Sequence, residues 1–180
     1  MSLSLSSTRI ARRACVVATI AAVMVFAAVG TAGAKGPPQS IDSGTSAGTA
    51  TGGLGTGTCF ANLTEDGTFT RIFVIGNGHV TEVLRSPYDL ALCVQQTETD
   101  GEFADSGTFT LTTPDGTLIA SVSGTETVGT FSFTLTATGG TGLYQGVAGT
   151  IAWSGTRTVV GVSTFSTTGV WTANLNRPVL

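Results

Sequence analysis

Residues 130–149 constrain the fold more than any other stretch of this chain, because they join a strand pattern to a glycine-rich corner. Phe131 and Phe133 alternate with hydroxylated residues, which is the period of two that a β-strand with one apolar face requires. The sequence Gly139-Gly140-Thr141-Gly142 follows, and glycine reaches backbone angles that are closed to other residues. A second strand pattern begins directly after the corner, in residues 150–156. The stretch therefore predicts two strands connected by a tight corner.

The same alternation recurs through residues 58–176, where no long helical period appears. Apolar residues that would share the inner surface are Phe109, Leu111, Leu118, Ala120, Val122, Phe131, Phe133 and Leu135. Turn signals such as Asn77-Gly78 separate about eight or nine short segments, which predicts an all-β antiparallel barrel or sandwich. A closed barrel removes the exposed sheet edges that Thr- and Val-rich strands otherwise present, so we expect the barrel.

Residues 1–34 have the pattern of a secretory signal peptide. Arg9, Arg12 and Arg13 precede an Ala-rich apolar run, and Ala32-Gly33-Ala34 has the A-x-A form of a cleavage site. The alternative is an uncleaved membrane anchor, but the apolar run is short for a spanning helix, which needs roughly 20 residues. We therefore expect cleavage after Ala34 and a secreted, extracellular protein.

The residues after the predicted cleavage site divide into two parts. Residues 35–57 are rich in Gly, Ser, Thr and Ala and lack the apolar side chains that offset the entropy of ordering, so we expect a flexible leader. Residues 58–176 would then form a single β-barrel domain. After cleavage five basic and eleven acidic residues remain, for a formal charge of −6. This balance argues against nucleic acid and against a membrane as partners of the mature protein.

Two cysteines, Cys59 and Cys93, remain after cleavage. In an oxidising compartment an isolated pair most simply forms a disulfide. The alternative is a catalytic thiol or a metal ligand, but the chain has no C-x-x-C spacing after residue 34 and only one histidine, His79. We therefore expect a Cys59–Cys93 disulfide, no metal site and no cofactor.

The sequence of residues 139–149, GGTGLYQGVAG, resembles the glycine signature of the allene oxide cyclase and dirigent barrel superfamily, and the flanking strand patterns in residues 107–154 also fit it. The resemblance implies a single eight-stranded antiparallel β-barrel with an apolar interior. Plant members cyclise an unstable epoxide or steer radical coupling, and related bacterial barrels catalyse cyclisations in polyketide biosynthesis. These activities depend largely on the shape of an apolar pocket. No catalytic residue of those families matches a position of this chain by motif.

Candidate ligand-binding residues are the aromatic side chains of the expected interior and of the glycine corner: Phe69, Phe73, Phe109, Phe131, Phe133 and Tyr144. Arg71 lies in phase with Phe69 and Phe73, and Glu82 lies on the strand that the Asn77-Gly78 hairpin folds back. An inward Arg71–Glu82 pair would orient the polar end of an apolar ligand. In the alternative, Arg71 points to solvent, which is the commoner position of a charged residue.

Two further expectations concern loops. The sequence Ser86-Pro87 is expected to break a strand, which places Tyr88 in a rim loop. There it could contact a ligand, and with Arg71 and Glu82 it is a candidate catalytic residue; in the alternative, the loop is merely polar. Tyr144 is expected to close one end of the barrel with its ring. The acidic segment of residues 97–106, which contains Asp105, lacks the glycine and the terminal glutamate of an EF-hand loop, so we expect a solvated connection.

These observations leave two functions open. The first is a secreted barrel that binds a small apolar molecule inside and is a candidate isomerase- or cyclase-like catalyst without a metal or nucleotide cofactor. The second is a non-catalytic carrier or interaction module whose core is filled by its own side chains. A pocket on the order of several hundred Å³ would favour the first function, and a packed interior would favour the second. An adhesive domain would instead need an open sandwich. The sequence does not indicate an oligomeric state.

Overall fold

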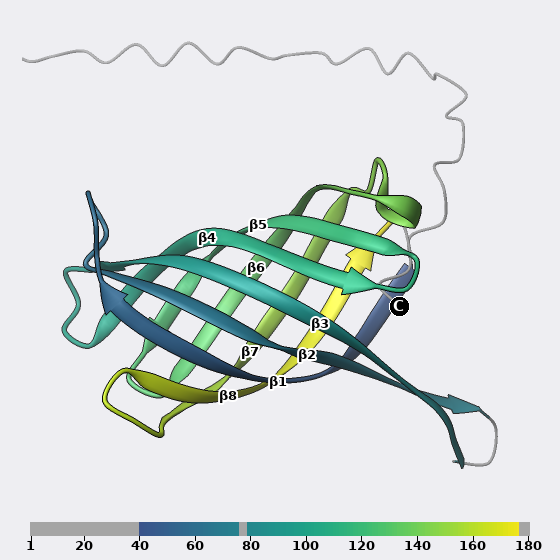
Figure 1. Ribbon diagram of the computed structural model, residues 1–180, viewed down its shortest axis with the longest axis horizontal. Coiled ribbons are helices and arrows are strands. Elements are labelled where there is room, and N and C mark those ends of the chain that lie inside the picture. Colours follow the sequence, from purple (N-terminus) through teal and green to yellow (C-terminus); the bar gives the residue numbers. More distant parts are fainter. Residues whose placement is uncertain (1–39, 76–78, 177–180) are drawn as a thin grey trace, which may run out of the picture. The chain divides into compact units, whose positions relative to one another are not determined.

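The protein is a closed β-barrel in which eight antiparallel strands follow one another in sequence order within the described residues (Figure 1). The computed structural model describes residues 40–75 and 79–176, with side chains except those of residues 40–41 and 72–83. The elements are β1 (Ser40–Leu54), β2 (Ala61–Ile75), β3 (His79–Gln96), β4 (Glu102–Thr113), β5 (Gly116–Thr127), β6 (Thr130–Gly140), the 3₁₀ turn η1 (Gly142–Tyr144), β7 (Gly149–Val159) and β8 (Thr164–Leu175). No helix in this part of the chain is long and apolar enough to cross a membrane.

Closure of the barrel comes from β1, which pairs with β2 on one side and with β8 on the other. This arrangement confirms the predicted eight-stranded antiparallel barrel and excludes the open sandwich of an adhesive domain. The prediction of a flexible leader over residues 35–57 is wrong for Ser40–Leu54, which forms β1, and the barrel therefore starts at residue 40 instead of 58. The predicted signal peptide, residues 1–34, lies outside the described residues.

The inner face of β1 explains why its composition was misleading. Its inward positions are small or polar, and a Cβ added to Gly44 would lie 2.7 Å from the ring of Trp171. A Cβ added to Gly48 would lie 2.5 Å from the hydroxyl of Tyr88. The strand thus needs few apolar side chains of its own, because large rings from β8 and β3 fill the space beneath it.

The predicted strand break at Ser86-Pro87 is also wrong, since β3 continues through both residues. The ladder between β3 and β4 begins at Tyr88, so Pro87 lies where β3 pairs only with β2. Proline lacks a donor for a second neighbour and is tolerated at such one-sided positions. Tyr88 is therefore not in a rim loop: it is a strand residue with a buried side chain.

Aromatic rings fill the middle of the barrel. Phe69, Tyr88, Phe109, Trp153 and Trp171 are each at most 1% exposed. Phe69 contacts each of the other four rings, with centroids 5.1 to 5.4 Å apart. The indole nitrogen of Trp153 donates to the hydroxyl of Ser46 over 2.8 Å. The eight residues predicted for the inner surface are all buried, as expected: Phe109, Leu111, Leu118, Ala120, Val122, Phe131, Phe133 and Leu135.

The two ends of the barrel differ. The corner end holds η1 and the β4–β5 turn, and the mouth end is formed by the β1–β2, β3–β4 and β7–β8 loops and the β5–β6 turn (Figure 1). At the mouth end, the predicted disulfide between Cys59 and Cys93 is present and ties the β1–β2 loop to β3. At the corner end, Tyr144 is buried. The amide of Leu143 donates to the carbonyl oxygen of Asp115 over 3.0 Å, which holds η1 against the β4–β5 turn.

The glycine corner provides a matched pair of substitutions. Gly142 and Gly146 both have positive φ angles, 58° and 71°, but only Gly142 is close to other backbone, with Asp115 O 2.0 Å from an added Cβ. We expect Gly146→Ala to lower the free energy of unfolding by roughly 1–2 kcal/mol through the backbone angle alone. Gly142→Ala should lower it by about 1–3 kcal/mol more through overlap. Urea unfolding followed by tryptophan fluorescence measures both, and equal losses would contradict the close packing of the corner.

Candidate functional site

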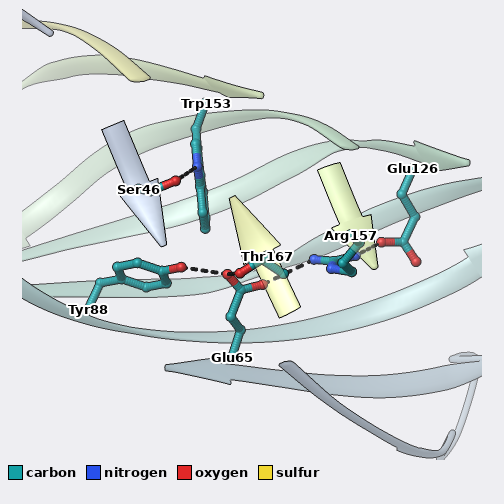
Figure 2. Close-up of polar contacts among 7 residues, drawn as sticks. All are labelled: Ser46, Glu65, Tyr88, Glu126, Trp153, Arg157 and Thr167. Carbon is teal, nitrogen blue, oxygen red and sulfur yellow. Dashed lines mark hydrogen bonds and ion pairs between the residues drawn. The ribbon is translucent and has the colours of Figure 1, made fainter. Parts of the chain in front are cut away.

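A cluster of charged side chains lies inside the barrel between the aromatic core and the mouth end (Figure 2). Arg157 comes from an inward position of β7, and its guanidinium donates to the Glu65 carboxylate of β2, with Nη2 and Oε2 3.3 Å apart. The same guanidinium forms an ion pair with Glu126 of β5. A buried cation is tolerated only when it is paired, and two carboxylates pair this one.

Glu65 is held at the centre of the cluster. Its Oε1 accepts a hydrogen bond from the Tyr88 hydroxyl over 2.5 Å and another from the Thr167 hydroxyl over 2.7 Å. Figure 2 shows the Glu65 carboxylate between Tyr88 on one side and Arg157 on the other. Burial raises the pKa of Tyr88, and the nearby Glu65 charge raises it further, so the phenol remains a hydrogen-bond donor. Glu65 therefore connects the aromatic core to the charged cluster.

The Arg157 guanidinium also lies against two aromatic rings. Its central carbon is 5.2 Å from the ring centroid of Phe131 and 5.8 Å from that of Phe133. These distances lie within the range of cation–π contacts. The Nε atom of Arg157 is buried and has no hydrogen-bond partner among the described residues. Arg157 thus has its charge satisfied while one of its donors is unused.

Asp105 is the fourth charged group of the cluster, and the prediction of a solvated acidic connection is wrong for it. β4 already begins at Glu102, and Asp105 faces inward with a side chain that is 4% exposed. Neither carboxylate oxygen has a hydrogen-bond partner among the described residues. Burial raises the pKa of Asp105 to about 6, although the charge of Arg157 opposes this shift.

A pocket of about 250 Å³, the mouth pocket, opens at the mouth end above this cluster. Its walls are mainly apolar and include Leu63, Phe103, Val159 and Phe165. Arg157 and Glu126 supply its charged lining. Further exposed apolar side chains lie around this end: Leu54 at the end of β1, and Phe60, Val128 and Val160 in the loops. The volume is just below the range of about 300–1,000 Å³ that is usual for small-molecule sites.

The predicted site residues divide between the core and this cluster. Phe131 and Phe133 lie beside Arg157, whereas Phe69 and Phe109 belong to the packed core and Tyr144 lies at the corner end. The side chain of Phe73 lies outside the described residues. None of the buried rings in the middle of the barrel lines the mouth pocket.

Arg71 makes an ion pair with Asp42 of β1, with Nη2 and Oδ1 2.6 Å apart. The Arg71 side chain is 19% exposed, so it is not the solvated residue of the alternative prediction. The predicted Arg71–Glu82 pair is not tested, because the side chain of Glu82 lies outside the described residues. Tyr88, the third candidate, contacts Glu65 in the core instead of a ligand in a rim loop.

Sequence reasoning missed Glu65, Asp105, Glu126 and Arg157. All four carry a signal that was available: Glu65 is in phase with Leu63 and Phe69, Asp105 with Phe103 and Phe109, Glu126 with Leu118 and Val122, and Arg157 with Ile151 and Trp153. Each charged residue therefore occupies an inward position of an otherwise apolar face. Among the described residues, no group of three or more His, Cys, Asp or Glu side chains is placed to hold a metal ion.

The central position of Glu65 can be tested by removing its charge. Glu65→Gln leaves buried Arg157 with only Glu126 as a partner, and we expect a loss of about 3 kcal/mol in the free energy of unfolding. The neighbouring Asp66 is exposed, so Asp66→Asn should change the free energy by less than about 0.5 kcal/mol. Urea unfolding of both variants gives the comparison, and similar values would show that the buried pair does not stabilise the barrel.

The titration of Asp105 makes stability depend on pH. Its carboxyl titrates near 3.9 in an unfolded chain and at about 6 in the folded protein, so the folded protein holds an extra proton between these values. The free energy of unfolding should therefore fall by roughly 2–3 kcal/mol as pH rises from about 4 to 6, and remain lower above that. Asp105→Asn lacks this titration, so its stability relative to the wild type should rise by the same amount over this range. The exposed Asp100→Asn variant is the control, and a difference that does not change with pH would contradict the burial of Asp105.

No protein-family model and no curated protein sequence matches this chain. A similar solved structure belongs to a protein described as a nonspecific heme-binding cyclase that catalyses a 4 + 2 cycloaddition during neoabyssomicin biosynthesis. The two chains are 13% identical, the match covers 77% of this chain and 68% of the other, and the TM-score is 0.45. A similarity of this size transfers no activity, so the function has to be argued from the site.

Proposed function

We propose that this protein is a secreted barrel that binds a small, largely apolar molecule in the mouth pocket. The observation that carries the proposal is an opening with apolar walls above buried charges, in a barrel that is otherwise packed. Sites for small molecules combine mostly apolar walls with a few placed polar groups. The apolar body of the ligand would lie against Leu63, Phe103 and Phe165, with its polar end toward Arg157 and Glu126.

The packed core limits where a ligand can bind. The rings of Phe69, Trp153 and Trp171 occupy the middle of the barrel and are each at most 1% exposed. The proposed ligand is therefore small and binds at the mouth end instead of in the middle of the barrel. The protein combines features of both functions that the sequence left open: a core filled by its own side chains, and a pocket with polar groups at one end.

Secretion is part of the proposal and rests on the predicted signal peptide of residues 1–34. The disulfide between Cys59 and Cys93 supports it, because disulfides persist in oxidising compartments. The disulfide lies beside the mouth end, where it fixes the β1–β2 loop.

A catalytic role is the second candidate, and the resemblance of residues 139–149 to allene oxide cyclase and dirigent barrels supports it. Such a catalyst would act mainly by folding a flexible substrate against the pocket walls. The two roles differ in one experiment. A compound is extracted from the purified protein and returned to protein from which it has been stripped. It should stay chemically unchanged if the protein is a carrier and be converted to another compound if the protein is a catalyst that holds its substrate.

Filling the pocket tests the binding proposal. Val159 lines the pocket, whereas Ile119 is an exposed aliphatic residue on the outer face of β5 and does not line it. With the neutral fluorescent probe N-phenyl-1-naphthylamine, we expect Val159→Trp to weaken binding about tenfold or more, because the indole occupies the ligand volume. Ile119→Trp should bind the probe like the wild type. Thermal unfolding verifies that both variants fold. The proposal fails if the wild type does not bind the probe, or if both variants bind it equally well.

A further inference from the structure

We propose that the molecule bound in the mouth pocket carries a protonated amine at its inner end, and that Asp105 holds this amine. The inference rests on the proposed function and specifies the chemical class of its ligand. Three independent features of the described residues support it: the charge balance of the cluster, the position of Asp105 below the pocket wall, and the aromatic surroundings.

The charge balance of the cluster leaves a cation missing. Arg157 is the one basic residue of the cluster among the described residues, and it is already paired with Glu65 and Glu126. Asp105 adds a third carboxylate that neither the guanidinium nor any described donor satisfies. A ligand carboxylate or phosphate would meet this surplus of negative charge and be rejected. A ligand ammonium group would balance this negative charge.

Asp105 does not line the pocket and its oxygens are buried, but it lies directly below the pocket wall, so the amine would reach it by entering below Phe103. Phe103 lines the pocket, and Asp105 is the next inward residue along β4. Opposite Asp105 on β5 is Gly124, which has no side chain to donate a hydrogen bond. A buried carboxylate without a donor is costly, and such exceptions in a folded protein call for a partner. The amine supplies up to three donors.

The aromatic rings around the cluster also favour a cation. Phe131 and Phe133 already face the Arg157 guanidinium at 5.2 and 5.8 Å, and Phe103 and Phe165 line the pocket. Ring faces attract ammonium groups as well as guanidinium groups, most strongly when water is excluded. The site is thus suited to an amine with an apolar body and unsuited to an acid of the same size.

The competing arrangement is internal. Arg157 Nε is buried without a partner, like the oxygens of Asp105, and a rotation of either side chain could join the two. Asp105 would then be satisfied by the protein itself and would have no role in ligand choice. This arrangement predicts that removing the Asp105 charge does not alter the preference among ligands, which makes the two arrangements distinguishable.

Three compounds with the same apolar body test the inference: phenylpropylamine, phenylpropanol and phenylpropanoate. Isothermal titration calorimetry at about pH 7.5 should show the amine binding at least tenfold more tightly than the alcohol, with the acid weakest. Asp105→Asn should reduce the affinity for the amine to that for the alcohol and leave the alcohol unchanged within about twofold. The variant is expected to fold, since it removes an unsatisfied buried charge.

A pH series on the wild type gives a second readout that needs no variant. The charged group that acts on Asp105 is Arg157 of β7, which is itself paired with Glu65 of β2 and Glu126 of β5, and Tyr88 of β3 stays protonated. Protonation of Asp105 below its pKa of about 6 should weaken amine binding about tenfold between pH 7.5 and pH 5, with alcohol binding constant.

The outcomes separate the two proposals. If N-phenyl-1-naphthylamine binds but the amine does not, or binds no better than the alcohol or the acid, the amine inference is wrong and the pocket remains. An amine preference that survives in Asp105→Asn also overturns the inference and favours the internal Asp105–Arg157 arrangement. If the wild type does not bind the naphthyl probe, the proposed function itself fails, and the amine inference fails with it.

Discussion

The fit between the inner face of β1 and the aromatic core determines the rest of this barrel. Gly44 and Gly48 leave the room that Trp171 and Tyr88 occupy, and the same strand closes the barrel by pairing with both β2 and β8. Large rings on one side and glycine on the other give dense packing without a central cavity. The cost is that the rings fill the middle of the barrel, so a site inside the barrel lies toward one of its ends.

The packed core also explains why charged groups gather where they do. Tyr88 is buried in the core, and its hydroxyl needs an acceptor there. Glu65 provides that acceptor, and its charge in turn needs a cation, which Arg157 supplies. Glu126 then pairs the remaining face of the guanidinium near the opening. Each polar side chain thus satisfies the one that lies deeper in the barrel. The order runs from Tyr88 in the core through Glu65 and Arg157 to Glu126 at the mouth pocket.

The sequence predicted the parts of this structure that local patterns encode. Alternation in residues 109–135 identified the inner face, and glycine at positive φ identified the corner at Gly142. It failed for β1, whose stability comes from neighbouring strands rather than from its own side chains. It failed for the charged cluster because Glu65 and Arg157 are 92 residues apart and no local pattern reports their contact. Alternation shows which face a residue occupies, but it does not show that a charge on the inner face will find a partner.

Stability alone does not account for the composition of the mouth end. An apolar residue at position 105 would continue the pattern of Phe103 and Phe109 and would avoid the burial of a carboxylate with no donor among the described residues. Sequences usually agree with their fold at every level, and departures from that agreement concentrate where a protein contacts other molecules. Glu65, Glu126 and Arg157 satisfy one another and can be explained as structure. Asp105 cannot be explained in this way. It lies one inward position below Phe103, the β4 residue that lines the pocket, and this is why the function of this barrel is best sought at the mouth end.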